Sequence, residues 1–125
     1  MTSTHKDLIV WQKSMDLAAG IYSVTRYFPK SEEFGLTSQM RRAVVSIPSN
    51  IAEGYGRGSR KELQRFLEFS SGSASELETQ LLICQRVELL PVEVVNDLCK
   101  DIKTILKMLS SLISRCKEDV SYRKK

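Results

Sequence analysis

A short glycine-rich segment followed by cationic residues carries the clearest binding chemistry in the sequence. It spans residues 54–61 (GYGRGSRK) and supplies Arg57, Arg60 and Lys61, and Arg65 follows about one helical turn later. Flexible glycines, an aromatic ring and clustered cations are ingredients of a phosphate-binding site, especially beside the positive N-terminus of a helix. Rossmann and Walker glycine motifs must follow a strand, whereas this segment joins two predicted helices. The alternative is an ordinary interhelical turn with solvated charges.

A second group of polar residues falls on the segment 39–54 (QMRRAVVSIPSNIAEG). At about 100° per residue, one polar helix face contains Arg42, Ser46, Ser49 and Glu53, with Gln39 and Asn50 beside it. One interpretation is a phosphate-binding surface led by Arg41 and Arg42, because the planar guanidinium suits phosphate. The other is a polar subunit contact, or a network that satisfies backbone groups freed by Pro48.

The sequence shows no recognisable catalytic or metal-binding motif. Its single histidine, His5, lies near the N-terminus and is interpreted as solvated. The adjacent Glu32 and Glu33 lack a partner for general acid and base roles, and no Glu-x-x-His pair supports a di-iron centre. We therefore predict a protein that is not an enzyme and that holds no cofactor or metal.

Composition predicts one domain, residues 1–125, in the cytoplasm. The chain is 42% hydrophobic, which suffices for one core, and no segment resembles a signal peptide or a membrane span. The widely spaced Cys84, Cys99 and Cys116 are expected to be buried, reduced thiols. The net charge of +4 favours anionic partners.

Hydrophobic periodicity predicts helices over roughly residues 8–28, 35–55, 59–89 and 91–117. Pro29 should end the first, Pro48 should kink or locally break the second, and Ser59 with Glu62 forms a capping box for the third. Pro91 suits the first turn of the fourth. Short connections favour an all-α, antiparallel up-and-down four-helix bundle.

Three helices carry further signals. Helix 8–28 has two apolar rows, so it is either deeply embedded in its own bundle or meets another subunit. Small residues fill the middle of the third helix, residues 69–75, and would allow a neighbouring helix to approach closely. On the fourth, Lys100, Lys103 and Lys107 lie opposite the apolar side and are interpreted as a solvated face.

Residues 39–54 also resemble the signature of a bacterial family, the four-helix-bundle proteins encoded by intervening sequences within 23S ribosomal RNA genes. The similarity continues in residues 7–13 (DLIVWQK), in 28–29 with 33–37, and in 66–67 with 72–73 and 76–78, and so covers roughly residues 7–90. It implies a four-helix bundle that assembles into a ring-shaped homopentamer. Distant relatives are accessory proteins of diversity-generating retroelements, which bind nucleic acid and a reverse transcriptase.

Two functional hypotheses follow. The first is a non-enzymatic homo-oligomer that contacts structured RNA or other nucleic acid through Arg41, Arg42, Arg57, Arg60, Lys61 and Arg65. The second is a protein-interaction scaffold whose ring and polar face on the second helix hold a partner protein without binding nucleic acid. Neither hypothesis identifies the RNA or the partner.

Overall fold

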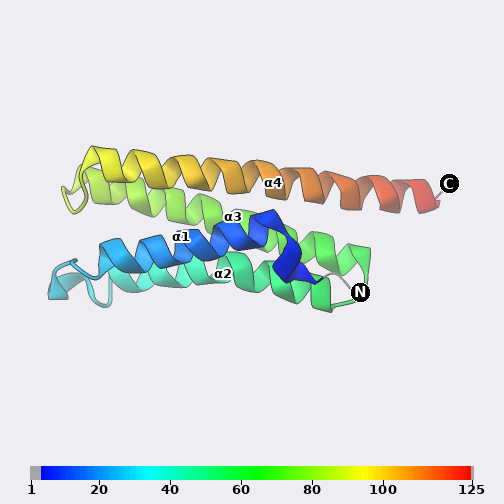
Figure 1. Cartoon of the computed structure of the whole chain (residues 1–125), viewed down its shortest axis with the longest axis horizontal. Helices are drawn as coiled ribbons and strands as arrows, with labels where there is room; N and C mark the ends of the chain where they lie inside the picture. The colour runs from blue at the N-terminus through cyan, green and yellow to red at the C-terminus, as the bar shows by residue number, and fades with distance from the viewer. Residues whose placement is uncertain (1–3, 125) are drawn as a thin grey trace.

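The computed structural model describes the backbone of residues 4–124 and the side chains of residues 4–118. Within this part the chain forms four α-helices and no strand (Figure 1). The helices are α1 (Ile9–Thr25), α2 (Leu36–Gly56), α3 (Arg60–Arg86) and α4 (Val92–Lys124). Short 3-10 helices, η1 (His5–Asp7) and η2 (Lys30–Glu32), precede α1 and α2. The predicted all-helical class and the four helices are confirmed.

Successive helices run antiparallel and pack in the cyclic order α1, α2, α3, α4 (Figure 1). α2 and α4 both pack extensively on α3, whereas α1 packs on α2 and makes a smaller contact with α4. α4 has 33 residues against 17 in α1, so it extends well beyond α1 at the right-hand end of the view. The bundle therefore has two different ends.

Several helix ends differ from the sequence-based prediction. α1 ends at Thr25 rather than at residue 28, because the residue before Pro29 is disfavoured in helical conformation. α3 ends at Arg86 rather than at residue 89, since Glu88 takes a left-handed conformation with φ of 63°. α4 continues past residue 117 to Lys124.

The core is a single cluster along the length of the bundle. Its largest fully buried side chains are Ile21, Met40, Ile47, Ile51, Leu67, Leu77, Leu81, Ile102, Ile105 and Leu109. They recur at helical spacing on α2, α3 and α4, and α1 contributes Ile21. Burying a side chain of this size stabilises a protein by about 1.5–3 kcal/mol. This cluster holds the two ends of the bundle at fixed positions.

Small residues bring α2 and α3 together. Ser70 and Ala74 are fully buried, and the Ser70 hydroxyl donates to the Ile47 carbonyl oxygen at 2.8 Å. The hydroxyls of Ser46 and Ser73 share a hydrogen bond of 2.6 Å across the same interface. α2 runs through Pro48 as one helix, so the local break allowed by the sequence is absent. The expected close approach at the middle of α3 is present.

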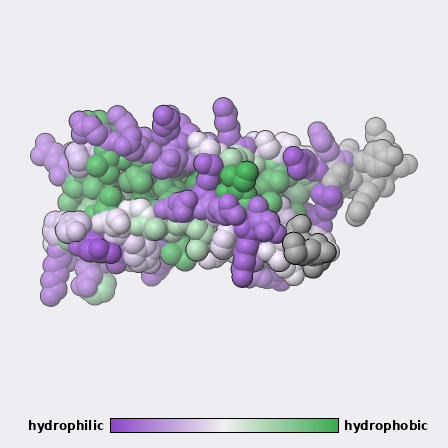
Figure 2. All heavy atoms as spheres, in the orientation of Figure 1, coloured by the Kyte–Doolittle hydropathy of each residue, from purple (hydrophilic) through white to green (hydrophobic). Residues whose placement is uncertain are grey.

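α1 has two apolar rows, one that includes Val10, Leu17 and Ile21 and one that includes Met15 and Tyr22, and they differ in exposure. Val10, Leu17 and Ile21 are buried, whereas Met15 and Tyr22 are 45% and 41% exposed. Hydrophobic residues also line the seam between α1 and α4, and hydrophilic residues cover the outer side of α4 (Figure 2). Lys100, Lys103 and Lys107 are exposed, as the solvated-face interpretation requires. In the described residues no helix combines the length and the apolar character that crossing a membrane requires.

Candidate functional site

Five cationic side chains gather where α2 ends and α3 begins, next to the distal part of α4. We call this set, Arg57, Arg60, Lys61, Arg65 and Arg115, the basic end. The chain turns between α2 and α3 at Gly58, whose φ of 81° suits glycine. The Ser59 hydroxyl then caps α3 by accepting a hydrogen bond from the Glu62 amide at 3.1 Å. The turn and the cap fix the backbone positions from which these cationic side chains extend.

Two arginines of the basic end lie over the same aromatic ring. The guanidinium carbons of Arg57 and Arg65 are 5.0 and 5.4 Å from the centre of the Phe66 ring. Arg57 also pairs with Glu53 at 3.0 Å, and Arg65 pairs with Glu62 at 3.3 Å. Half of the expected capping box is present, since the Ser59 hydroxyl accepts from the Glu62 amide. The Glu62 carboxylate pairs with Arg65. Both ion pairs are solvated and of the kind that contributes at most about 1 kcal/mol.

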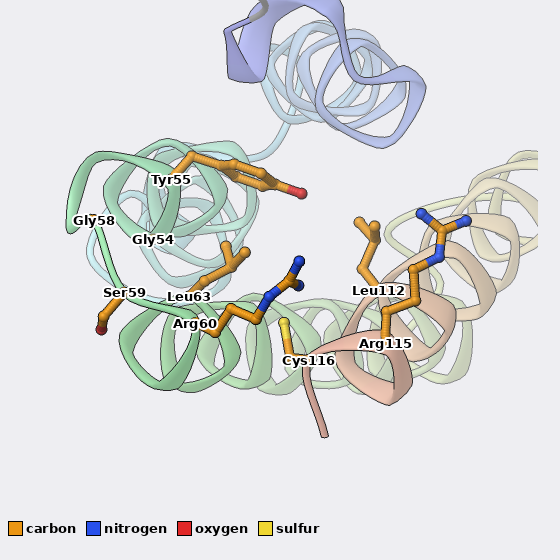
Figure 3. A pocket seen from close by; sticks show the side chains of 9 residues that line it. All are labelled: Gly54, Tyr55, Gly58, Ser59, Arg60, Leu63, Leu112, Arg115 and Cys116. Carbon is orange, nitrogen blue, oxygen red and sulfur yellow. The ribbon is translucent and has the colours of Figure 1, made fainter. Parts of the chain in front are cut away.

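The turn also borders a cavity of about 430 Å³ between α2, α3 and α4 (Figure 3). Arg60 extends toward it from α3 and Arg115 from α4, while the Tyr55 hydroxyl points in from the end of α2. Leu63, Leu112 and Cys116 supply its apolar surface. Among the described side chains, the lining thus combines two permanent positive charges and the Tyr55 hydroxyl with an apolar floor.

The electrostatics of this cavity act on Tyr55. Burial raises the pKa of the Tyr55 phenol, the neighbouring Cys116 thiol raises it further, and Arg115 and Arg60 lower it. The net shift is upward, so the phenol keeps its proton at neutral pH and remains a hydrogen-bond donor. A donor and two guanidinium groups facing one space can bind an anion.

The other two predicted cations lie elsewhere. Arg42 precedes Arg57 by 15 residues along α2, which corresponds to about 22 Å. Arg41 donates from Nε to the buried Thr25 hydroxyl at 3.0 Å, and its guanidinium carbon lies 4.5 Å from the centre of the Tyr22 ring. Arg42 is exposed on the same face. The six predicted cations therefore form two regions rather than one surface.

The predicted polar face of α2 is divided in the same way. Asn50 donates to the Ser46 carbonyl oxygen at 2.8 Å, and the Ser46 hydroxyl lies 2.7 Å from the Ala43 carbonyl oxygen. Neither acceptor is the Val44 carbonyl, the group that loses its helical donor at Pro48, so these contacts leave the backbone interpretation untested. Glu53 instead belongs with Arg57 at the basic end, while Gln39 and Ser49 are exposed.

The family model described as 23S rRNA-intervening sequence protein matches residues 6–111. The chain belongs to this family. The match extends the resemblance seen in residues 7–90 along most of α4, the helix whose sequence is least distinctive.

A solved structure shares the fold of this family member. It is a protein of unknown function from the S23 ribosomal protein family of Bacteroides thetaiotaomicron, with 29% identity and a TM-score of 0.76. The similarity covers 84% of this chain and 98% of that chain. No curated protein matches.

The part of the site on α4, Arg115 and Cys116, was not predicted from the sequence. Arg41 to Arg65 lie inside the matched residues, whereas Arg115 and Cys116 lie beyond them. Arg115 is on α4, about 50 residues after Arg65, and only the antiparallel return of α4 places it beside Arg60. Its signal in the sequence was a cation next to an apolar position of the fourth predicted helix, Cys116, which is buried.

Proposed function

We propose that this family member is a homo-oligomeric binding protein that contacts structured RNA through its basic end. The observation that carries the proposal is that five cationic residues, on the α2–α3 turn, on α3 and on α4, lie at one end of the bundle. Phosphate neutralisation by lysine and arginine dominates the affinity of most nucleic-acid complexes.

The ion pairs at the basic end are weak enough for a phosphate to replace the carboxylate partner of the arginine. In the Arg57–Glu53 pair the side chains are 47% and 52% exposed, so water already screens the attraction. Such pairs contribute about 0.2–1 kcal/mol, and a phosphate can replace the carboxylate at little cost. The aromatic ring of Phe66 holds the guanidinium planes near the surface while they exchange partners.

The role is one of binding without catalysis. Arginine stays protonated at all physiological pH values and so cannot exchange protons as a general acid or base. The cations that define the basic end are therefore suited to positioning and charge neutralisation.

We place the contact between copies of the chain on the face shared by α1 and α2. Met15 and Tyr22 of α1 and Val45 of α2 are each more than two-fifths exposed, and Arg42 and Ser49 lie beside Val45. An apolar centre with a polar rim is the usual composition of a subunit interface. A ring of five copies, as the family resemblance implies, would present five basic ends to one RNA and strengthen weak contacts by multivalency.

Fluorescence anisotropy with a ribosomal RNA hairpin and a DNA duplex of equal length tests the proposal between about 50 and 200 mM salt. Neutralising two to four phosphates per copy predicts a slope of about −2 to −4 in log affinity against log salt. The triple variant R57A/K61A/R65A should lose affinity about 10- to 100-fold at low salt and flatten that slope. The variant K100A/K103A/K107A, which removes the same charge from the outer side of α4, is the matched control.

Equal losses in the two triple variants would show that net charge, not the basic end, determines binding. Absence of binding by the unmodified protein at low salt would overturn the RNA proposal. In that case the apolar face of α1 and α2 favours the second function, a scaffold for a partner protein. Substituting Met15 and Val45 by serine would then release the partner or dissociate the oligomer, as size-exclusion chromatography with light scattering would show.

A further inference from the structure

Two phenylalanine rings lie beside the arginines of the basic end, and only one of them is covered. Phe66 is 9% exposed, whereas Phe69, about one helical turn further along α3, is 45% exposed. The guanidinium carbon of Arg65 lies 5.4 Å from the centre of the Phe66 ring and 5.2 Å from that of Phe69. We propose that the exposed ring of Phe69 stacks on an unpaired base, so that the basic end selects RNA with unpaired nucleotides over fully paired helices. This inference rests on the proposed function and names the kind of RNA that it requires.

Contacts within the bundle hold the Phe69 ring in place before any RNA binds. The rings of Phe66 and Phe69 meet edge to face, with centres 5.4 Å apart and planes at 86°, a favoured geometry for aromatic pairs. Phe66 packs closely on α2, since a Cβ atom at Gly54 would lie only 3.0 Å from its own Cβ. A side chain that is already ordered loses little conformational entropy when a ligand stacks on it.

The surface beyond Phe69 leaves room for a planar group. The next turn of α3 carries Gly72 and Ser73, three and four residues after Phe69, which are the positions that neighbour it on a helix. A Cβ atom at Gly72 would meet nothing within 4 Å, and the Ser73 hydroxyl is hydrogen-bonded to Ser46 of α2 at 2.6 Å. Neither residue therefore places a large side chain over this side of the ring.

The charges beside the ring suit the phosphates of the same nucleotide. The side chains of Arg57 and Arg65 are 47% and 56% exposed, and their carboxylate partners, Glu53 and Glu62, also reach solvent. Both guanidinium groups can therefore contact phosphates next to a base that is stacked on Phe69. Aromatic rings among cations are typical of sites for single-stranded nucleic acid, whereas a paired helix keeps the faces of its bases stacked inside.

The surroundings of Phe69 fit a base better than a protein partner. The centre of a protein interface is a contiguous apolar area. Along α3, however, the positions about one turn from Phe69 are Arg65, Gly72 and Ser73, together with the buried Phe66. One exposed ring between a cation and small residues is enough for stacking, which needs only the face of a single aromatic side chain.

The exposed rings of Tyr22 and Phe34 lack part of this arrangement. Tyr22 has the guanidinium of Arg41 over its ring, but that arginine is hydrogen-bonded to Thr25. Phe34 is 90% exposed, and no ring or guanidinium of residues 4–118 contacts it. Phe69 has an open side, a second ring that orients it and a solvated arginine beside it.

A pair of RNA hairpins tests the stacking on the intact protein. Both have the same stem and five loop nucleotides, which carry adenine in one hairpin and no base in the other, so the number of phosphates is equal. In fluorescence anisotropy the adenine hairpin should bind about 5- to 100-fold more tightly, as expected for stacking of one base on an aromatic ring. Phe69→Leu keeps an apolar side chain but removes the ring, and should abolish that preference by weakening the adenine complex alone.

Phe34→Leu is the matched control, because it removes an exposed phenylalanine ring in the turn before α2, at the other end of the bundle (Figure 1). It should leave both affinities unchanged. Stacking involves no net charge, so the loss in Phe69→Leu should be equal at about 50 and 200 mM salt, whereas R57A/K61A/R65A flattens the salt dependence. Phe69→Trp should bind the adenine hairpin at least as tightly as the unmodified protein, and circular dichroism verifies that each variant folds.

The outcomes separate this inference from the proposed function. If both hairpins bind equally, with a steep salt dependence that R57A/K61A/R65A flattens, the stacking inference fails and the proposed function stands. Equal losses in Phe69→Leu and Phe34→Leu would also overturn the stacking inference. If neither hairpin binds, the proposed function fails and this inference fails with it. A lower mass of Phe69→Leu in light scattering would then assign the ring to a contact between copies of the chain.

Discussion

The two ends of the bundle use polar side chains in different ways. At the end formed by the η2 turn and the α3–α4 connection, which we call the closed end, Arg41 is hydrogen-bonded to Thr25 and Cys84 lies 3.5 Å from the sulfur of Met40. At the basic end, Arg60 and Arg115 extend from two helices toward a cavity (Figure 3). Arg41 is thus tied to a neighbouring helix, whereas Arg60 and Arg115 come from two helices that border one cavity.

The difference shows why counting cations along the sequence is a poor guide to a binding surface. Arg41 and Arg42 are adjacent, yet Arg41 joins α1 to α2 and Arg42 is exposed beside the apolar face of α1 and α2. Substitutions at the closed end should change the free energy of unfolding, and substitutions at the basic end should change binding. The four predictions below test this division.

The largest effect is expected for Arg41→Ala. The substitution removes the hydrogen bond to Thr25 and the contact with the Tyr22 ring, so we expect a loss of about 2–3 kcal/mol in the free energy of unfolding. Arg42→Ala is the matched control and should change stability by less than about 0.5 kcal/mol. Urea unfolding followed by circular dichroism measures both. Equal stability of the two variants would remove Arg41 from the structural role assigned to it.

The second prediction concerns alkaline pH at the closed end. Burial, with a smaller contribution from Glu32, raises the pKa of the Cys84 thiol from 9.0 to about 11. Between these values the unfolded chain loses the thiol proton while the folded protein keeps it, so stability falls as pH rises above about 9. The loss should approach about 2 kcal/mol at pH 11.

The Cys84→Ala variant isolates this contribution, because lysines and tyrosines titrate in the same range. Urea unfolding of both proteins at several pH values between 8 and 11 should show a shallower pH dependence for the variant, whatever its stability at pH 8. Parallel curves would mean that the Cys84 thiol titrates alike in the folded and unfolded states.

The sequence predicted the helices better than it predicted the contacts at either end of the bundle. Periodicity identified the four helices, and Ser59 was correctly predicted to cap α3. Local signals of this kind depend on neighbouring residues only. The cavity instead needs Arg115 from α4 beside Arg60 from α3, and no local pattern states which residues of two long helices become neighbours. The helix ends at Thr25 and Arg86 were missed by a few residues, because they depend on individual backbone conformations.

The third prediction compares a glycine with close neighbours, Gly54, and a glycine with open space around it, Gly72. A Cβ atom at Gly54, next to the basic end, would lie 3.0 Å from Cβ of Phe66 and 3.2 Å from Cδ1 of Leu63. Phe66 Cβ is fixed to its backbone, so Gly54→Ala should push α2 from α3 and cost about 1 kcal/mol net of the helix-propensity gain. A Cβ at Gly72 meets nothing within 4 Å, and Gly72→Ala should stabilise α3 by about 0.5–1 kcal/mol.

Thermal and urea unfolding of the two alanine variants give the sign of each change. Stabilisation by both would show that Phe66 and Leu63 can move aside, and that the contact between α2 and α3 near the basic end is not tightly packed. Because Phe66 also lies beneath Arg57 and Arg65, a shift of its ring in Gly54→Ala should additionally weaken hairpin RNA binding.

The smallest expected effect comes from Glu53→Gln, which removes the carboxylate paired with Arg57 at 3.0 Å. Because this exposed pair contributes at most about 1 kcal/mol, the fold should be nearly unaffected, while Arg57 becomes available to phosphate. We expect RNA affinity to rise about two- to threefold at 50 mM salt, with the gain shrinking as salt screens the charges. Glu93→Gln, the same change at the opposite end of the bundle, is the control in anisotropy titrations. A similar gain in both variants would assign the effect to net charge, and a lower affinity of Glu53→Gln alone would mean that Glu53 positions Arg57 for the RNA rather than competing with it.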